Sequence, residues 1–506
     1  MALAAVSLDD KYTLERGRVF LTGSQALARL PMMQRQRDRH AGLDTGGFIS
    51  GYRGSPLGGY DAALWSASRF LSRSHIKFQP GLNEDLALTA VWGTQQVNLW
   101  PGGKYDGVFG IWYGKGPGVD RSGDAIKHLN YDGTAKHGGV LLVAGDDHGA
   151  KSSTLPHQSE PAFMAAAVPV FHPAGVQEYL DLGLHGFAMS RYSGCAVGFK
   201  AVGETVESSA SVSIDPNAVE IARLIDFDMP GDGLNLRYPD DIMEKESRLL
   251  NYKLPAAQAY VRANGLDKMI FDTPRPRLGI VTTGKAYLDV RQAFDELGVT
   301  AEMAADMGIR LYKVAMTWPL EPQGALEFAK GLEEIVVIEE KRPILEDQLR
   351  SLLYGQANAP RIVGKKDENN RILLPEIGEL TPGMVAQIKE RFKLPVMKAV
   401  AIASDEDIAT ARLYEITADR LLFDAKPPPG ADRPGGNALS FDWRLIADQE
   451  WLLPWMLAGG LEASNLAEAI TTSGATAVDV SSGVEDEPGV KNPEKIKELL
   501  ALAGTL

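Results

Sequence analysis

The side chains best suited to chemistry stand where predicted strands end. Glu84 begins a helical segment that follows the loop Arg53-Gly54-Ser55, and four cationic or imidazole side chains lie on later loops. These four are Lys115, Arg121, His148 and His157. Such groups can contact an anionic substrate, although each can equally be a solvated loop residue. A carboxyl in the first turn of a helix can also simply complement the helix dipole, so Glu84 has a structural interpretation too.

A second set of candidate residues occupies the last quarter of the chain. Asp424 ends one predicted strand and Asp479 lies in another. Two glycine- and serine-containing loops follow strands; their residues are Gly459, Gly460, Ser481, Ser482 and Gly483. Glycine lets a ligand approach backbone N–H groups closely and serine adds a hydroxyl. The loops are therefore either a binding site or ordinary turns between strand and helix.

The elements that must position the first set alternate strand, glycine loop and helix. Residues 47–52, 107–113 and 139–145 are predicted strands, and residues 86–97 a helix. This alternation predicts a doubly wound parallel sheet over residues 1–230. In such sheets the functional groups gather on loops beyond the C-terminal ends of the strands. We therefore expect Glu84 to be buried, or to line a pocket, at that edge, facing the loops that carry Gly54 and Lys115.

A connector and a second, smaller α/β domain follow. From residue 215 the pattern gives way to Pro, Gly and Asp, with two helical pieces, and we assign residues 231–274 to the connector. The triplet Gly231-Asp232-Gly233 does not follow a strand and is predicted to be a turn. Strands are predicted at 278–283, 311–314 and 334–340, with a helix at 286–297, which gives an α/β domain over residues 275–386.

The last segment, residues 387–506, repeats a strand–helix unit four times. The predicted strands are 396–402, 420–424, 455–458 and 477–480, and the predicted helices are 405–414, 442–448, 465–472 and 493–503. A complete (βα)8 barrel has eight such units, so this segment predicts a (βα)4 half of a TIM barrel. Its parallel four-stranded sheet would have open outer strands, which tend to recruit another chain; we therefore expect a homo-oligomer.

Composition excludes several classes of function. The 506 residues are 44% hydrophobic and 23% charged, with no stretch near the ~18 apolar residues of a membrane span. The net charge of −14 argues against a nucleic-acid partner. The single cysteine, Cys195, has small apolar neighbours and is interpreted as a buried structural thiol. One thiol cannot hold a four-thiolate iron–sulfur cluster, and the absence of a basic leader favours a cytoplasmic protein.

Four segments in order resemble one enzyme family. They are GYRGSPLGG, PGLNEDLA, WYGKGPGVDRSGD and VLLVAGDDHGAKSSTLPHQSE. Together they resemble the N-terminal part of the indolepyruvate ferredoxin oxidoreductases, which are 2-oxoacid:acceptor oxidoreductases, from about Ser7 to about Val385. The resemblance implies that residues 1–230 are a thiamine-pyrimidine domain. It also implies a transketolase C-terminal-like domain from residue 275 to about residue 355.

This resemblance implies roles for the first set of residues. Glu84 matches the family's pyrimidine-binding glutamate, whose carboxyl bonds N1′ of the thiamine diphosphate aminopyrimidine. Gly54 and Ser55 belong to the implied cofactor loop, and Lys115, Arg121, His148 and His157 are candidates to contact the 2-oxoacid or the cofactor. The family holds the diphosphate and Mg on a separate domain and carries iron–sulfur clusters. Further domains or a partner chain would therefore bind the diphosphate, Mg and the iron–sulfur clusters, and would supply the contacts to CoA and ferredoxin.

A second resemblance covers residues 388–506. The segments DRLLFDAKPPPGADRPGGNALSFDW, MLAGGLEASNLAEAI and VDVSSGVEDEPGVKNPEKI resemble the C-terminal half of phosphoribosylanthranilate isomerase, an enzyme of tryptophan biosynthesis. The resemblance implies that Asp424 is the general acid, that Asp479 contacts substrate, and that the two glycine–serine loops bind phosphate. The family's general base is a cysteine on a first strand that this sequence does not contain, so isomerase activity of this chain alone is not expected.

Three functional interpretations follow. The first is a thiamine-dependent aryl 2-oxoacid oxidoreductase that lacks a diphosphate-binding and an iron–sulfur domain. The second is a phosphoribosylanthranilate isomerase represented by its C-terminal half. The third is a non-catalytic fusion or misassembled product, since the two resemblances meet at residues 385–388 without a linker.

Overall fold

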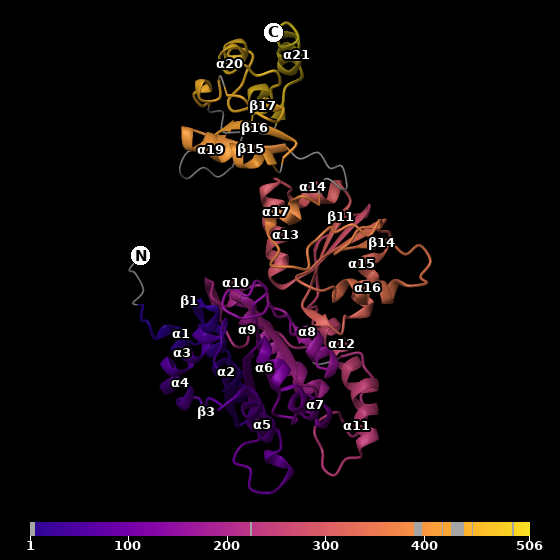
Figure 1. Cartoon of the computed structure of the whole chain (residues 1–506). Coiled ribbons are helices and arrows are strands. Elements are labelled where there is room, and N and C mark those ends of the chain that lie inside the picture. Colours follow the sequence, from indigo (N-terminus) through magenta and orange to yellow (C-terminus); the bar gives the residue numbers. More distant parts are fainter. Residues whose placement is uncertain are drawn as a thin grey trace. The chain divides into compact units, whose positions relative to one another are not determined.

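The computed structural model describes residues 6–222, 225–388, 397–416, 418–426, 440–447, 449–487 and 490–506. It divides into two compact units (Figure 1). Unit 1 comprises Met1–Asp289 with Glu302–Thr381, and unit 2 comprises Val290–Ala301 with Pro382–Leu506. The sequence also predicts a loop at residues 426–430; its residues 427–430 and the first residue of the strand predicted at 396–402 lie outside the described residues.

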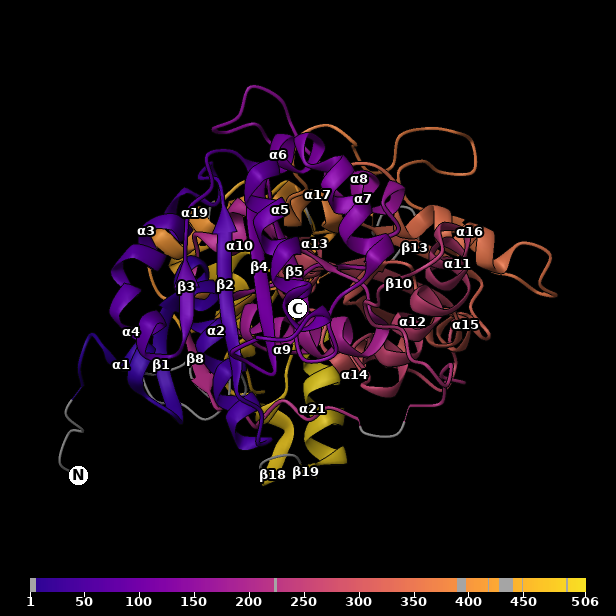
Figure 2. The ribbon, with the colours of Figure 1, turned by 90° about the horizontal axis from the view of Figure 1, so that it is seen from below.

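Unit 1 contains a seven-stranded sheet. Its strands are β2 (Thr45–Gly51), β3 (Ile76–Phe78), β4 (Gly107–Lys115), β5 (Val140–Asp146), β6 (Val170–Phe171), β7 (Val197–Val202) and β12 (Met316–Trp318). The order across the sheet is β12-β6-β7-β5-β4-β2-β3, and every pair is parallel except β12 with β6. Figure 2 shows β3, β2 and β4 side by side. The predicted parallel α/β sheet is confirmed.

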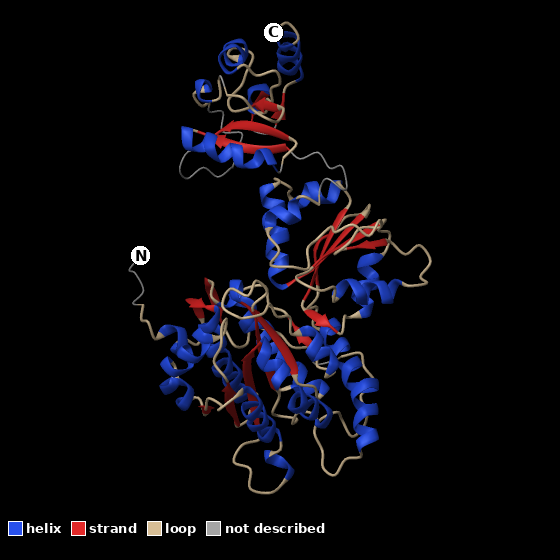
Figure 3. Ribbon diagram, viewed as in Figure 1, coloured by secondary structure: helices blue, strands red, loops and turns tan. Residues whose placement is uncertain are grey.

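Helices cover both faces of this sheet (Figure 3). The helices on one face are α2 (Gly23–His40), α3 (Gly58–Ser66), α4 (Ser68–Arg73), α9 (Val176–Ser193) and α12 (Leu254–Ala263). The helices on the other are α5 (Glu84–Gln95), α6 (Gly116–Arg121), α7 (Gly123–Asp132) and α8 (Glu160–Ala165). Successive strand residues point to opposite faces, so Leu141 and Val143 pack with the first set while Leu142 and Ala144 pack with the second.

Shorter elements complete this part of unit 1. They are α1 (Asp10–Thr13), β1 (Gly17–Thr22), the 3₁₀ helix η1 (Val97–Leu99), α10 (Gly203–Val206), β8 (Ser209–Ile214), α11 (Ile242–Arg248) and the π-helix η2 (Leu249–Lys253). β1 and β8 form an antiparallel pair of their own. Gly231 and Asp232 lie in a turn that Gly233 continues with a φ of +72°, as the sequence predicts. Cys195 is fully buried, which confirms its interpretation as a structural thiol.

A five-stranded sheet forms the second part of unit 1. Its strands are β9 (Lys268–Phe271), β10 (Leu278–Thr283), β11 (Ile309–Val314), β13 (Glu334–Ile338) and β14 (Arg361–Val363), in the order β14-β13-β10-β11-β9. Associated helices are α15 (Pro322–Ala329) and α16 (Leu345–Leu353). α13 (Gly284–Glu296) begins in unit 1 and continues into unit 2 from Val290, and α14 (Ala301–Asp306) lies in unit 1 from its second residue. α15 and α16 pack against one face through an apolar cluster that includes Phe328 and Leu349. β9 lies within the stretch that the sequence assigns to the connector.

Unit 2 is built on three parallel strands. Its elements are α17 (Pro382–Ala386), β15 (Met397–Ile402), α19 (Asp405–Leu413), η3 (Tyr414–Ile416), β16 (Arg420–Ala425), η4 (Trp443–Leu445), β17 (Trp455–Leu457), α20 (Leu466–Ser473), η5 (Ser482–Val484), β18 (Glu485–Glu487), β19 (Val490–Lys491) and α21 (Pro493–Ala503). The strand order is β15-β16-β17. Phe423, Leu457 and Ala469 belong to the apolar core that joins the sheet to its helices.

Two details of the half-barrel prediction are wrong. The fourth strand, predicted at 477–480, pairs only through an isolated parallel bridge between Leu457 and Val478. β17 is only three residues long, so its edge is too short to pair with a full fourth strand. The helix predicted at 442–448 is only the single 3₁₀ turn η4, because Asp442 accepts a hydrogen bond from the Arg444 N–H and closes a local turn. None of the helices in the described part of the chain combines the length and apolar character needed to cross a bilayer.

Candidate functional sites in the two units

Glu84 lies at the C-terminal edge of the seven-stranded sheet. The loop before it is held there because the N–H of Gly81 donates to the carbonyl of Gly51, the last residue of β2 (2.8 Å). Asn83 caps α5 by accepting a hydrogen bond from the N–H of Leu86, so Glu84 occupies the first helical position. The indole N–H of Trp112 donates to the Glu84 carbonyl (2.9 Å) and fixes the helix start against β4.

The Glu84 side chain is buried against a glycine-rich loop. It is 7% exposed, and a Cβ built on Gly118 would lie 2.5 Å from its Cγ. A Cβ on Gly114 would lie 3.3 Å from the same atom. Within residues 6–222 and 225–388, no side chain or N–H donates a hydrogen bond to its carboxylate. A buried carboxylate without a donor retains its full capacity to accept a hydrogen bond from a ligand.

Gly54, Ser55 and Lys115 lie close to this edge. A Cβ on Gly54 would come within 2.9 Å of the Lys115 side chain, so glycine is needed where the two loops meet. Ser55 accepts a hydrogen bond from the hydroxyl of Ser152, which belongs to the polar loop after β5. The structure therefore brings together the loops that follow β2, β4 and β5.

His157 joins these loops to a buried acid. Its Nε2 lies 2.8 Å from Asp120 and its Nδ1 lies 3.5 Å from Asp146. Burial lowers the pKa of the imidazole, but the neighbouring carboxylates of Asp146 and Asp120 outweigh burial and raise it above the ordinary value. A Cβ on Gly116 would overlap the ring, at 2.0 Å from Nδ1. His157 is thus held against the loop that also contacts Glu84, in a place that favours its protonated form.

His148 and Arg121 lie in two different surroundings. His148 is buried, with Nδ1 3.8 Å from Glu340, and burial holds its pKa well below the ordinary value. Its ring is therefore neutral near pH 7. Arg121 is exposed at the end of α6 opposite to Gly116. A role for either side chain in contacting substrate stays a prediction.

A buried ionic cluster behind His157 escapes sequence reasoning. Lys200 is 1% exposed and lies 2.7 Å from Glu160 and 3.5 Å from Asp146. Asp146 also accepts hydrogen bonds from the N–H and hydroxyl of Ser159, and its pKa is held well below the usual range despite burial. In the sequence, this cluster is indicated only by a lysine within the apolar strand β7 and by an acid that ends β5.

In unit 2, Asp424 and Asp479 face the same end of the sheet. Asp424 lies near the end of β16, and its pKa is raised by burial and by the nearby charge of Asp479. The N–H of Asp479 donates to the carbonyl of Leu457 (2.8 Å), which holds it at the end of β17. A carboxyl with a raised pKa, next to a second carboxylate, is suited to donate a proton.

The two glycine–serine loops of unit 2 contact each other. A Cβ on Gly483 would lie 1.9 Å from the carbonyl oxygen of Leu461, and one on Gly459 would lie 3.1 Å from Oδ1 of Asp424. Gly459 and Gly460 have φ values of +87° and +61°, which favour glycine. Ser481 accepts a hydrogen bond from Lys491 (3.0 Å), which brings a cation to this loop, and Ser482 begins η5. The predicted phosphate loops and the two acids therefore meet at one end of the sheet.

The described residues contain no group of three or more His, Cys, Asp or Glu side chains placed to hold a metal ion. The candidate residues of both sites are acids, cations and backbone N–H groups. In unit 1 these are Glu84, Lys115 and His157. In unit 2 they are Asp424, Asp479 and the glycine–serine loops.

Comparison with protein families identifies two parts. The indolepyruvate oxidoreductase domain matches residues 268–407, and N-(5'-phosphoribosyl)anthranilate isomerase matches residues 383–501. The first match begins at β9, and the two overlap across residues 383–407, which contain β15. In fold, 74% of the chain is similar to 65% of a 2-oxoglutarate:ferredoxin oxidoreductase from Magnetococcus marinus, with a TM-score of 0.52 and 14% identity.

Curated relatives match the C-terminal part. An isomerase of this name from Cereibacter sphaeroides is 55% identical over 126 residues, which are 25% of this chain and 59% of the relative. The chain thus spans about three fifths of the first relatives it matches. The relative from Parvibaculum lavamentivorans is 45% identical over 163 residues, which are 30% of this chain and 76% of the relative. Through residues 383–501 the chain belongs to the N-(5'-phosphoribosyl)anthranilate isomerase family, and it joins that part to an indolepyruvate oxidoreductase-like domain.

Proposed function

We propose that unit 1 provides the pyrimidine-binding half of a thiamine diphosphate site for oxidation of an aryl 2-oxoacid. The observation that carries the proposal is the Glu84 carboxylate, which is 7% exposed and has no hydrogen-bond donor within residues 6–222 and 225–388. The match of residues 268–407 to an indolepyruvate oxidoreductase domain supports the same class of enzyme.

The residues at this edge fit the aminopyrimidine group. Glu84 would form a hydrogen bond between its carboxyl group and N1′ of the ring, and Gly114 and Gly118 leave space beside that group because they lack a Cβ. Thiamine diphosphate supplies a nucleophilic carbon for attack on a 2-oxo carbon. Lys115 and His157 would hold the 2-oxoacid carboxylate. The diphosphate and Mg would be held by a further domain or a partner chain.

The test is ligand-detected NMR of thiamine with the full chain. We expect saturation transfer to the pyrimidine methyl group, and loss of most of it in Glu84→Gln, which keeps the side chain's shape but removes its charge. Glu207→Gln changes an exposed acid and is the matched control. Equal transfer in the wild type and in Glu84→Gln would contradict the proposal.

The same proposal predicts what the purified chain cannot do. One cysteine cannot ligate a cluster, so electrons have no path to ferredoxin within these 506 residues. We expect no reduction of a low-potential viologen with indolepyruvate, thiamine diphosphate, CoA and Mg. Turnover by this chain alone would show that its electron path differs from the one proposed.

A second candidate function belongs to unit 2. The contact between Gly483 and Leu461 and the closeness of Asp424 to Asp479 favour a site for a phosphorylated sugar. In this proposal the N–H groups of both loops bind phosphate and Asp424 acts as the acid. Asp479 contacts the sugar. The family's cysteine base has no counterpart here, so ligand binding would persist without isomerisation.

Phosphate titration of the full chain tests this second function. We expect chemical-shift changes at Gly460 and Ser482 together with no isomerase turnover. Turnover without an added chain would contradict the need for the missing half.

Unit 2 also exposes the outer edge of β15 within the described sheet. We propose that a second copy of the chain pairs with this edge. Light scattering should then report a dimer.

A further inference from the structure

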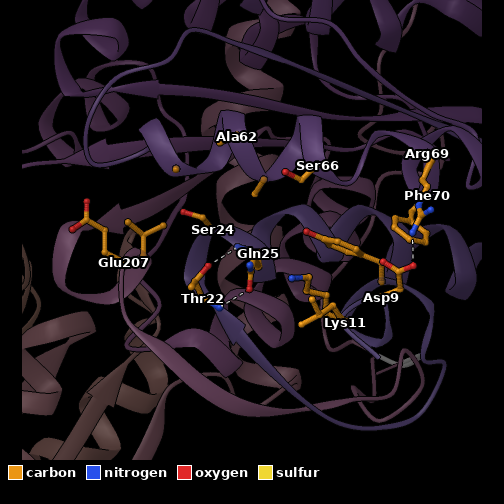
Figure 4. A pocket seen from close by; sticks show the side chains of 15 residues that line it. Asp9, Lys11, Thr22, Ser24, Gln25, Ala62, Ser66, Arg69, Phe70 and Glu207 are labelled. Carbon is orange, nitrogen blue, oxygen red and sulfur yellow. Dashed lines mark hydrogen bonds and ion pairs between the residues drawn. The ribbon is translucent and has the colours of Figure 1, made fainter. Parts of the chain in front are cut away.

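Two cavities of unit 1 have linings that differ in charge. One, of about 580 Å³, is lined by α1, α2, α3 and α4 (Figure 4). Its Asp9 and Arg69 form an ion pair, and the side chains of Thr22 and Gln25 close a capping box at the start of α2. Lys11 and Glu207 add one charge of each sign, so this cavity does not select a charged ligand.

The other cavity, of about 540 Å³, has a different character. It lies at the N-terminal ends of the strands: Leu43 precedes β2, and Lys136 and His137 precede β5. The C-terminal ends of α2 and α9 form its other side through Arg37 and Arg191. Glu84 lies at the opposite edge of the same sheet, so this cavity is separate from the candidate site of unit 1.

Positive charge is concentrated around this cavity. Arg37, Lys136 and Arg191 line it together with one acid, Asp38, which gives a formal charge of +2 in a chain whose net charge is −14. Arg191 and Asp38 form a two-bond ion pair (2.6 and 2.9 Å), and Arg37 donates to the carbonyl of Val219 (2.8 Å). These contacts hold both guanidinium groups in place.

Lys136 and His137 have no such partners. Lys136 is exposed and forms no ion pair within the described residues. The His137 ring likewise makes no hydrogen bond there, and its pKa is lowered by burial and by the charges of Arg191 and Lys136. A cation and an imidazole are therefore left to meet an anion at the mouth of the cavity.

The walls of the cavity are mostly apolar. Its apolar lining residues are Leu43, Ala188, Tyr192, Ile221, Met229 and Leu234. Three of them, Ile221, Met229 and Leu234, come from the segment between β8 and α11 and close the cavity from that side. An inorganic anion would leave this apolar surface unfilled, whereas an uncharged ligand would leave the cations unused.

We propose that this cavity binds a small organic carboxylate with an aromatic body, held by Lys136. The carboxylate lies at Lys136 and His137, and the aromatic ring lies among Tyr192, Met229 and Leu234. The occupant stabilises the folded unit, because it joins the segment after β8 to α2 and α9. This site is independent of the proposed thiamine site, since the two lie at opposite ends of the strands.

The experiment titrates phenylacetate into the full chain and follows thermal unfolding and calorimetric heat. Phenylacetate should bind saturably and raise the melting temperature. Phenylacetamide lacks the charge and acetate lacks the ring, so each should bind at least about tenfold more weakly. Lys136→Ala should weaken phenylacetate binding by about tenfold, and Lys136→Glu should abolish it.

Two variants separate this site from others. Lys127→Ala removes an exposed lysine that does not line the cavity, and it should leave the affinity unchanged. Glu84→Gln should also leave it unchanged, which distinguishes this site from the proposed 2-oxoacid site. Equal affinity for phenylacetamide, equal weakening by Lys127→Ala, or no saturable binding would overturn the proposal.

Discussion

Gly118 and Glu84 are in such close contact that a methyl group on the glycine would lie 2.5 Å from Cγ of the acid. Gly118→Ala must therefore displace the Glu84 side chain or shift the start of α6. We expect the free energy of unfolding to fall by about 1–3 kcal/mol, as for other overpacked sites. Denaturant unfolding of the full chain measures the change.

Gly123→Ala is the matched control for this variant. Gly123 begins α7, and a Cβ there meets nothing within 4 Å. Alanine is the better helix former, so this variant should be neutral or stabilised by up to about 1 kcal/mol. Equal destabilisation by both variants would show that the Glu84 contact is not the cause.

The imidazole of His157 should respond to its buried partner. Asp146→Asn removes a carboxylate that raises the pKa of His157, so the pKa should fall. Because the folded pKa is raised, this interaction stabilises the wild type fully below about pH 6.5 and is lost as the pH rises through the folded pKa. NMR titration of the ring, assigned with His157→Gln, measures the shift. Asp124→Asn, which alters the partner of His128 instead, should leave His157 unchanged.

Lys253 should make stability depend on alkaline pH. Burial lowers the pKa of this lysine to about 8, although it donates to the carbonyls of Asn130 and Tyr131. Between about pH 8 and its usual value near 10.4 the unfolded chain binds more protons, so the free energy of unfolding should rise with pH. Lys253→Met removes this contribution and should flatten the slope, whereas Lys127→Met should not. Identical slopes for both variants would refute the effect.

Gly483→Ala should separate the two loops of unit 2. Its Cβ would overlap the carbonyl oxygen of Leu461, so one loop must move. We expect a loss of phosphate-induced shifts at Gly460 and a lower melting temperature. Gly504→Ala places its Cβ at an ordinary 3.4 Å from the nearest backbone atom and should change neither. Unchanged phosphate-induced shifts in Gly483→Ala would show that the contact between Gly483 and Leu461 is not needed for phosphate binding.

Local signals predicted several elements well. The helix at residues 493–503 has an Asn492 cap and Pro493 at its first position, and the structure has α21 at the same residues. The strand at 107–113 is an apolar run and the strand at 420–424 has an apolar centre, and both are found. Elements that depend on distant partners were missed: β9 exists by pairing with β11, and β12 by pairing with β6.

Some residues of the candidate sites were predicted from the sequence, whereas others are recognised only in the folded chain. Glu84 was predicted from the resemblance of its surrounding segments to the oxidoreductase family, and its burial follows from the glycines that approach it. Lys200 and Glu160 carry no local signal, because only the folded sheet brings them within 2.7 Å. His148 looked like a loop residue available to substrate, yet it is buried beside Glu340, which is nearly two hundred residues away in sequence.

The strand β12 determines where unit 1 can be cut. It comes from the second α/β part of the chain, yet it forms the edge of the seven-stranded sheet beside β6. A gene truncated after residue 230 would remove it and leave β6, two residues long, as a bare edge next to β7. Such an edge readily pairs with other chains, so a shortened protein would be prone to aggregate on expression. The N-terminal sheet should therefore be produced together with residues up to Thr381.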